Sequence, residues 1–165
     1  FIAMALACNP EILIADEPTT ALDVLIEAQI IALLRELKKK LNLTLILISH
    51  DLSLIAQVCN KAMVMYAGRI VESSNIDSLF KNPKHPYTQA LLSAAPTPDP
   101  QVQRGRQRVL LEGEVPSPDR EYPGCPFADR CPLVEEICRQ EVPQLEGDSH
   151  QTACLKVVDL SRLKP

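Results

Sequence analysis

Two short apolar runs on either side of one long amphipathic segment constrain the fold of this chain more than any other feature. The runs at residues 11–16 (EILIAD) and 44–49 (TLILIS) are too short for helices and do not alternate, as expected of buried parallel strands. Between them, apolar residues recur with the helical period from Asp23, a residue suited to an N-cap, to Leu41. A strand, a crossover helix and a second strand predict a βαβ unit with a parallel sheet, which places the chain in the α/β class.

Shorter elements are expected on both sides of this unit. A turn at Ala67-Gly68 separates two runs with strand propensity and predicts a hairpin. Ser74 or Asn75 can cap one later helix, and Pro86 can open another. The expected elements are a helix over residues 1–8, a helix over 51–59, strands over 62–66 and 69–72, and helices ending at Phe80 and Ala94.

Composition divides the chain and limits its partners. Twelve of the fourteen prolines lie at or after Pro83, so we expect one domain over residues 1–82 and a Pro- and Cys-rich extension over 83–165, with a linker at 97–108. A net charge of -4 gives no broad basic field, so nucleic acid is not expected as a partner. No apolar stretch approaches the roughly 20 residues of a bilayer span.

Polar residues at the ends of the two predicted strands suggest phosphate chemistry. Asp16 and Glu17 end the first strand, and His50 follows the second. Transfer of a phosphoryl group needs a metal ion against the phosphates and an oriented water, which adjacent carboxylates at the carboxyl end of a sheet can provide. The spacing alone is equally compatible with a solvated turn that enters a helix.

Longer motifs favour the first interpretation. Residues 12–23 (ILIADEPTTALD) resemble the Walker B strand and D-loop of ATP-binding-cassette (ABC) ATPases, residues 1–10 resemble the helix after the signature sequence, and residues 48–51 (ISHD) resemble the switch-histidine loop. The resemblance implies the C-terminal part of a P-loop (RecA-like) NTPase core. It also implies site roles: Asp16 for Mg²⁺ through water, Glu17 as general base, His50 at the γ-phosphate of ATP, and Ala21, Leu22 and Asp23 at the interface with the partner ATPase.

Three motifs of that family do not occur in this sequence. A GxxxxGK[ST] phosphate loop, a Q-loop and an LSGGQ signature are absent, and all five glycines lie beyond residue 67. We therefore expect a C-terminal fragment that does not hydrolyse ATP alone, because nothing in it cradles the β- and γ-phosphates.

Four cysteines in the last segment require a separate explanation. They are Cys125, Cys131, Cys138 and Cys154. Two disulfides, a zinc site, an iron–sulfur cluster or incidental thiols are all possible from the spacing. The reducing compartment expected for an ATPase disfavours disulfides, but the lack of a close C-x2-4-C pair does not distinguish zinc from a cluster.

The extension resembles the C-terminal region of ATPase subunits from oligopeptide and dipeptide importers. The similar segments are residues 85–92 (HPYTQALL), 112–118 (EGEVPSP) and 124–132 (GCPFADRCP). The resemblance implies a [4Fe-4S] cluster on the four cysteines, with Zn²⁺ as the alternative. It also implies a second ABC ATPase subunit in a homo- or heterodimer, two transmembrane permease subunits, an indirect extracytoplasmic solute-binding protein, and a peripheral location on the cytoplasmic face of the membrane.

Two other functions are compatible with parts of the sequence. An ABC ATPase acting on nucleic acid or the ribosome would keep Asp16, Glu17 and His50, but would have no reason to carry the cysteine segment. A non-enzymatic metal-binding or interaction module would explain the missing phosphate loop.

Several remaining side chains are expected to be structural. We expect Cys8 and Cys59 to be small buried core residues, and Tyr66, Tyr87 and Phe127 to be packing residues. His85 and His150 are expected to be solvent-facing or helix-capping groups.

Overall fold

The computed structural model describes residues 2–20, 22–95, 109, 111–114, 116–117 and 121–156. By its internal contacts the chain divides into two compact units, Phe1–Asn60 and Lys61–Pro165. The linker expected at residues 97–108 lies outside the described residues. Within the described part of the chain, no helix combines the length and apolar character that a membrane span requires.

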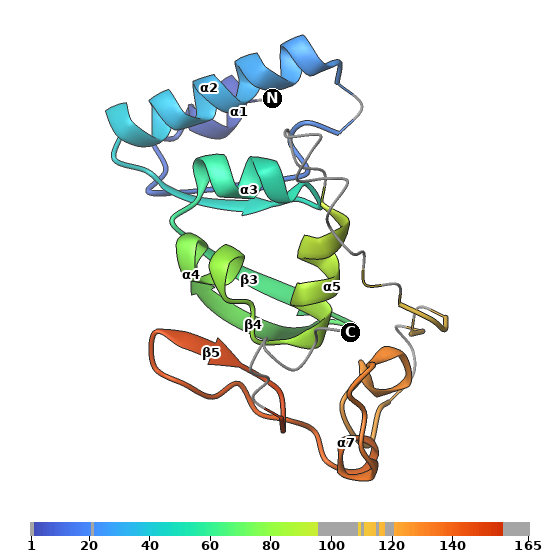
Figure 1. The fold of residues 1–165 in the computed structure, drawn as a ribbon. Coiled ribbons are helices and arrows are strands. Elements are labelled where there is room, and N and C mark those ends of the chain that lie inside the picture. Colours follow the sequence, from blue (N-terminus) through green and yellow to red (C-terminus); the bar gives the residue numbers. More distant parts are fainter. Residues whose placement is uncertain are drawn as a thin grey trace. The chain divides into compact units, whose positions relative to one another are not determined.

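The first unit has the predicted βαβ arrangement (Figure 1). Its strands pair in parallel, in register from Ile12 opposite Thr44 to Asp16 opposite Ile48. Its elements are α1 (Ile2–Leu6), β1 (Ile12–Asp16), α2 (Val24–Lys40), β2 (Thr44–Ile48) and α3 (Leu52–Val58). The α/β class and the order of these elements are therefore confirmed.

Local capping explains where the helices of the first unit begin. The Asp23 carboxylate accepts hydrogen bonds from the backbone N–H groups of Leu25 and Ile26 at 3.1 and 3.0 Å, which starts α2. Asp51 accepts in the same way from Ser53 and Leu54 and starts α3. Each carboxylate satisfies N–H groups that have no partner inside the helix and also lies at its positive end.

The core of this unit lies on one side of its two strands. Ile31 of α2 packs with Leu54 and Val58 of α3, and Leu45 and Leu47 of β2 pack against them. The other face carries large exposed apolar side chains, which are Ile12, Ile14, Ile46 and Ile48. The expectation that the strands are covered on both faces is wrong for the described residues, because α2 and α3 supply cover for one face.

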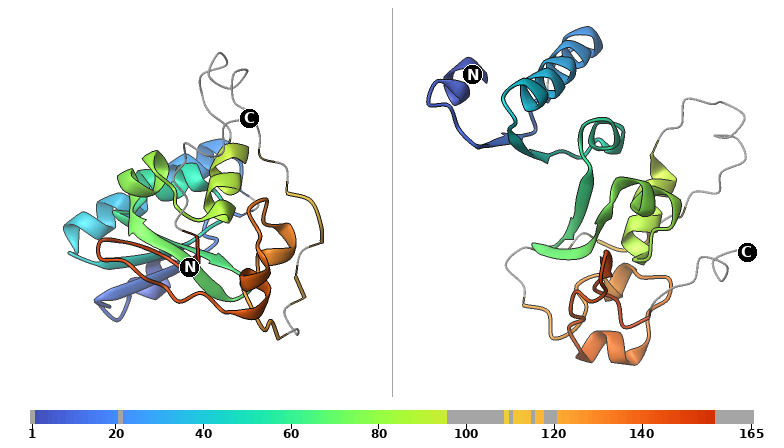
Figure 2. Two further views of the ribbon diagram at one scale, coloured as in Figure 1. Left: turned by 60° about the horizontal axis from the view of Figure 1, so that its bottom comes forward. Right: turned by 90° about the vertical axis from the view of Figure 1, so that its left-hand side faces the viewer.

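The second unit is built on an antiparallel sheet in the order β3-β4-β5, and Figure 2 shows β5 running beside the β3–β4 hairpin. The hairpin turns at Ala67 and Gly68, both with positive φ (47° and 75°), as a tight two-residue turn requires. The elements are β3 (Lys61–Tyr66), β4 (Arg69–Asn75), α4 (Ile76–Lys81), α5 (Pro86–Ala94), η1 (Ala128–Arg130), α7 (Glu136–Gln140) and β5 (His150–Thr152). β4 continues three residues beyond its predicted end.

An aromatic cluster joins the hairpin, α5 and the cysteine-bearing segment. The ring of Phe127, fully buried, lies 5.1 Å from Tyr66 of β3 and 5.5 Å from Tyr87 of α5 between centroids. Val64, Val71 and Leu79 complete the buried core around it. The packing role expected for the three aromatic side chains is confirmed, and the cysteine-bearing segment is an integral part of this unit.

The expected domain boundary after residue 82 differs from the boundary between the compact units. Helices α4 and α5 lie on opposite sides of the expected boundary, yet Leu79 of α4 and Tyr87 of α5 share one core. The expected boundary concerns where an ATPase core ends, and it stays a prediction.

Candidate functional site

The carboxyl ends of β1 and β2 bring together the three residues expected at a phosphate site. Asp16 is the last residue of β1 and lies opposite Ile48, and its side chain is exposed. The backbone N–H of Glu17 donates to the Ile48 carbonyl at 2.9 Å. This hydrogen bond extends the pairing of the two strands by one residue beyond the end of β1. Glu17 has a φ of 44°, a left-handed conformation that costs a non-glycine residue and is often found at functional sites.

Glu17 and His50 are in direct contact. Nδ1 of His50 lies 3.0 Å from Oε1 of Glu17, and the Thr20 hydroxyl donates to Oε2 of the same carboxylate at 2.5 Å. The Thr20 hydrogen bond, followed by the contact with His50, lowers the pKa of Glu17 below its ordinary value. The hydrogen bond and charge of Glu17 in turn raise the pKa of His50. At neutral pH the carboxylate is therefore ionised and available as a proton acceptor.

Thr20 is a member of this group that the sequence did not identify. Its position three residues after Glu17, within a turn closed by the Thr20 N–H and the Glu17 carbonyl at 3.2 Å, was the available signal. Glu17 and His50 are open to solvent, with 43% of the Glu17 side chain and 80% of the His50 side chain exposed. A ligand can therefore reach both groups.

The residues expected at a subunit interface follow directly. Leu22 is exposed, and Asp23 is committed to capping α2. Ala21 lies outside the described residues.

The four cysteines expected to share a site line one pocket of the second unit. The pocket has a cavity volume of about 20 Å³. Apart from the thiols it is lined by His85, Pro86, Phe127, Ala128, Leu133, Pro143, Leu155 and Lys156. Among the described residues, no group of three or more His, Cys, Asp or Glu side chains is arranged to hold a metal ion. The structure thus brings the four thiols together without forming a coordination site.

Backbone contacts fix the segments that carry these thiols. The Cys125 N–H donates to the Cys138 carbonyl at 2.7 Å. At Gly124 a Cβ atom would lie 2.4 Å from that same carbonyl oxygen, so the close approach requires glycine. The Cys154 thiol donates to the Lys156 carbonyl at 2.8 Å.

Burial makes three of these thiols, those of Cys125, Cys131 and Cys154, weaker acids. It raises the pKa of Cys125 and Cys154 and raises that of Cys131 to about 11. A soft cation that binds here must displace protons, as thiolate coordination always requires. Four sulfur donors in a mainly apolar pocket are a donor set that iron–sulfur clusters use.

The expectation for the two other cysteines is wrong in part. Cys8 is exposed and Cys59 is half-buried. Burial raises the pKa of Cys59. The apolar pattern around Cys8 belongs to the short helix α1, whose residues are not buried in the structure.

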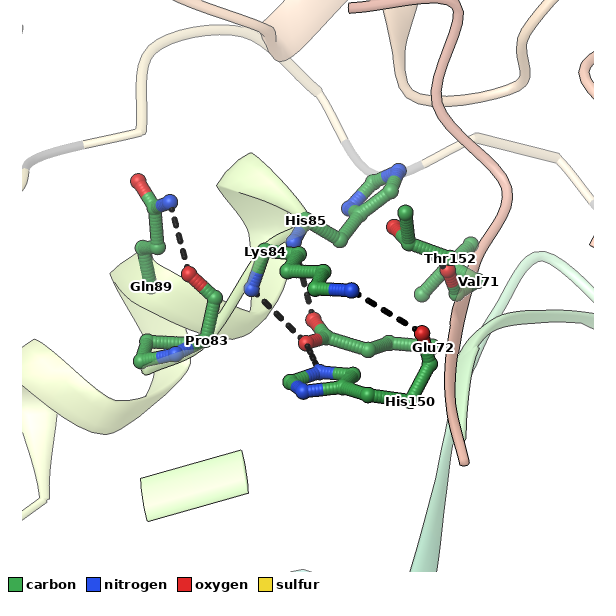
Figure 3. A network of polar contacts seen from close by, with 8 residues as sticks. All are labelled: Val71, Glu72, Pro83, Lys84, His85, Gln89, His150 and Thr152. Atoms are coloured by element: carbon green, nitrogen blue, oxygen red, sulfur yellow. Dashed lines mark hydrogen bonds and ion pairs between the residues drawn. The ribbon is translucent and has the colours of Figure 1, made fainter. Parts of the chain in front are cut away.

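A buried carboxylate, Glu72 of β4, organises the neighbourhood of the pocket (Figure 3). Its side chain is inaccessible to solvent. Oε1 accepts from the Lys84 N–H at 2.7 Å and lies 2.6 Å from Nε2 of His150, while Oε2 accepts from the His85 N–H at 2.9 Å. The Lys84 ammonium donates to the His150 carbonyl at 3.0 Å.

These contacts correct the expectation for the two histidines. His85 caps α5 as expected, because its Nδ1 accepts from the Tyr87 N–H at 3.1 Å, but it is 1% exposed and not solvent-facing. His150 lies in β5 with its side chain 11% exposed, so it is neither solvent-facing nor a helix cap. Sequence inspection also missed Glu72, whose partners lie 12 to 78 residues further along the chain.

Comparisons with known proteins agree with both resemblances. Residues 71–138 match the family described as the oligopeptide/dipeptide transporter C-terminal region. The oligopeptide transport ATP-binding protein OppF of Salmonella typhimurium is 46% identical over 157 residues, which are 94% of this chain and 47% of that protein. The probable peptide ABC transporter ATP-binding protein y4tR of Sinorhizobium fredii is 49% identical over 157 residues, covering 93% of this chain and 46% of that protein.

A solved structure is also similar in part. CbiO1 of Clostridium perfringens, part of the ABC transporter complex cbiONQ, is 36% identical and covers 49% of this chain and 32% of that chain, with a TM-score of 0.46. This similarity is too limited to define the fold.

The relatives OppF and y4tR are described as ATP-binding proteins of peptide transport, one of them of an ABC transporter. The similarity is to ATP-binding proteins of oligopeptide and peptide transport, and residues 71–138 carry the match to the oligopeptide/dipeptide transporter C-terminal region. The chain spans about half the length of the curated relatives it matches.

Proposed function

We propose that this chain forms part of an ATP-hydrolysing subunit that energises import of peptides or a related solute across the cytoplasmic membrane. The observation that carries the proposal is the contact between Glu17 and His50 at the carboxyl end of two parallel strands. Ligands of open α/β sheets bind at this end. The names of the relatives support peptide as the substrate class.

The chemical roles follow from the side chains. Glu17, ionised at neutral pH, accepts a proton from the attacking water as general base. His50, whose raised pKa favours the imidazolium form, contacts the γ-phosphate. Asp16 would hold Mg²⁺ through water, and the ion would neutralise phosphate charge.

Replacement of the proposed base tests this assignment. In the complete subunit, Glu17→Gln should reduce ATP hydrolysis by roughly 10² to 10⁴ with little loss of ATP binding, because a positioned base contributes about that much. Glu36→Gln is the matched control, since Glu36 is an exposed glutamate of α2 paired with Lys40. Wild-type turnover in Glu17→Gln would remove Glu17 from the mechanism.

The chain by itself is expected to be inactive. Its sequence contains no GxxxxGK[ST] loop, so Asp16 and Glu17 would face the phosphates without backbone amides and a lysine to balance the charge. Isothermal calorimetry at millimolar ATP should detect no saturable binding. A clear binding isotherm would contradict this expectation.

The assembly proposed is that of an ABC importer. A second ATPase subunit, identical or homologous, would contact Ala21, Leu22 and Asp23, and two transmembrane permease subunits would hold the pair at the cytoplasmic face of the membrane. An extracytoplasmic solute-binding protein would act indirectly. The exposed position of Leu22 is compatible with this interface. The fold proposed for residues 1–82 is part of a P-loop NTPase core, with residues 83–165 as the extension.

We further propose a [4Fe-4S] cluster on Cys125, Cys131, Cys138 and Cys154. The support is the convergence of all four thiols on one otherwise mainly apolar pocket. Anaerobically prepared protein should be brown, with broad visible absorption and both iron and sulfide. Stoichiometric zinc without iron or sulfide would show that the four cysteines bind zinc and not a cluster.

Neither alternative function gains support from the relatives. The relatives named above from sequence comparison are described as peptide or oligopeptide transport ATP-binding proteins, with no reference to nucleic acid or the ribosome. Neither of these two is described as a non-enzymatic module.

A further inference from the structure

The four-cysteine pocket contains one polar side chain that is buried as deeply as its apolar walls. His85 lines the pocket together with the thiols and is 1% exposed. Its ring lies 5.7 Å from that of Phe127, another wall of the pocket. A buried imidazole retains polar nitrogen atoms, and each of them needs a hydrogen-bond partner.

The helix cap determines which nitrogen of His85 carries the proton. Nδ1 accepts the Tyr87 N–H at 3.1 Å, so its lone pair is in use and the proton of the neutral ring resides on Nε2. Burial lowers the pKa of His85 to about 4, which keeps the ring neutral. Within the described part of the chain, Nε2–H has no hydrogen-bond acceptor, so the side chain presents a free donor.

Glu72 holds this histidine in place. Its carboxylate accepts the consecutive N–H groups of Lys84 and His85 at 2.7 and 2.9 Å, which fixes the turn before α5. Figure 3 shows the His85 ring turned away from that carboxylate, while the His150 ring lies against it. The same carboxylate contacts His150 of β5, four residues before Cys154. One buried group therefore anchors two walls of the pocket.

From this geometry we propose that Nε2–H of His85 donates a hydrogen bond to the iron–sulfur cluster held by the four cysteines. Glu72 is the residue that positions His85 for this contact. The inference rests on the cluster proposed above. A hydrogen bond to a cluster sulfur stabilises the additional negative charge of the reduced state more than that of the oxidised state. His85 thus tunes the cluster without ligating it.

Two substitutions separate the donor from the cap. In His85→Asn the shorter side chain can still accept the Tyr87 N–H, but it cannot present a donor at the position of Nε2. In His85→Gln the amide N–H₂ group restores a donor with longer reach. After anaerobic reconstitution of the full chain with ferrous iron and sulfide, His85→Asn should shift the midpoint reduction potential to a more negative value. His85→Gln should remain nearer the wild type.

A second measurement begins with the wild-type chain, whose folding no substitution has changed. With ¹⁵N-labelled histidine, pulsed EPR of the reduced wild-type cluster should detect one weak ¹⁵N coupling, as expected for a hydrogen-bonded ring. The chain has three histidines, and His85→Gln removes the relevant one while leaving His50 and His150. The coupling should be lost in that variant.

The outcomes distinguish the proposed cluster from the proposed hydrogen bond of His85. Wild-type chain that acquires no iron and sulfide would overturn the cluster and, with it, this inference. A loaded cluster with no ¹⁵N coupling, or with an unchanged potential in His85→Asn, would overturn the role of His85 alone. A strong coupling would also overturn it, because His85 would then be a ligand.

Discussion

Each unit of the molecule contains one glutamate paired with a histidine, and the two pairs differ in almost every physical property. Glu17 and His50 are 3.0 Å apart and exposed, with side chains 43% and 80% accessible. Glu72 and His150 are 2.6 Å apart, with side chains 0% and 11% accessible. The same two residue types therefore have different surroundings in the two units.

The comparison indicates what each pair can do. An exposed pair is screened by water and contributes little to stability. Either side chain can therefore contact a ligand in place of its partner at a small cost in free energy. A buried carboxylate must keep its hydrogen bonds, because an unpaired charge in the interior is strongly unfavourable. Glu72 satisfies this condition with Lys84, His85 and His150. We therefore assign a chemical role to Glu17 and His50 and a structural role to Glu72 and His150.

The largest effect that separates the pairs is expected on stability. Glu72→Ala leaves three donors unsatisfied and should lower the free energy of unfolding of the second unit by about 3–5 kcal/mol, the usual cost of breaking a buried pair. All three tyrosines lie in this unit and the chain has no tryptophan, so tyrosine fluorescence during urea denaturation reports on it selectively.

The matched variant is Glu17→Ala. Because Glu17 lies in the first unit and is exposed, this substitution should leave the tyrosine-monitored midpoint unchanged. Glu72→Gln should lie between the two, since its amide oxygen can still accept one of the hydrogen bonds. Equal midpoints for Glu72→Ala and Glu17→Ala would contradict the architectural role of Glu72.

A smaller effect is expected on the titration of the exposed pair. Glu17 raises the pKa of His50, so the contribution of protonated His50 is complete below its ordinary pKa of 6.5 and disappears as pH rises through the folded value. The lowered pKa of Glu17 gives a contribution present above 4.5 and lost as pH falls through the folded value. The pair is therefore intact between these two limits.

Nuclear magnetic resonance of the His50 ring measures this directly. The titration midpoint should lie above 6.5 in the wild type and return toward it in Glu17→Gln. Glu36→Gln, which removes another exposed glutamate of the same unit, should have no effect on His50. A midpoint that does not respond to Glu17→Gln would show that the two side chains do not interact in solution.

The two pairs also differ in how far the sequence could predict them. Asp16, Glu17 and His50 end strands that were recognisable from short apolar runs, and parallel strands necessarily present their carboxyl ends on the same side. The cap at Asp23 and the turn at Ala67-Gly68 depend on neighbouring residues and were equally predictable from the sequence. Local chemistry was enough for this part of the molecule.

Glu72 could not be predicted because its environment is set by distant parts of the chain. Glu72 ends the strand expected over residues 69–72, where a glutamate normally faces solvent. Its burial depends on β5, which pairs with β4 through residues 150–152, and on the turn before α5. The same long-range packing buries His85, whose capping role was predictable from Pro86 but whose environment was not.

The smallest contrast expected is between the cysteines of the two units. In the metal-free chain, exposed Cys8 should react fastest with iodoacetamide at pH 8, and Cys131 slowest. Burial raises the pKa of Cys131 from 9.0 to about 11, which reduces its thiolate fraction about 100-fold, and the thiolate is the reactive form. Mass spectrometry of partially alkylated protein gives the order. In urea-unfolded protein the two thiols should react at similar rates, because the difference comes from burial. Equal rates in the folded chain would mean that the pocket around Cys131 is open in solution, and the apolar environment proposed for the cluster would then be wrong.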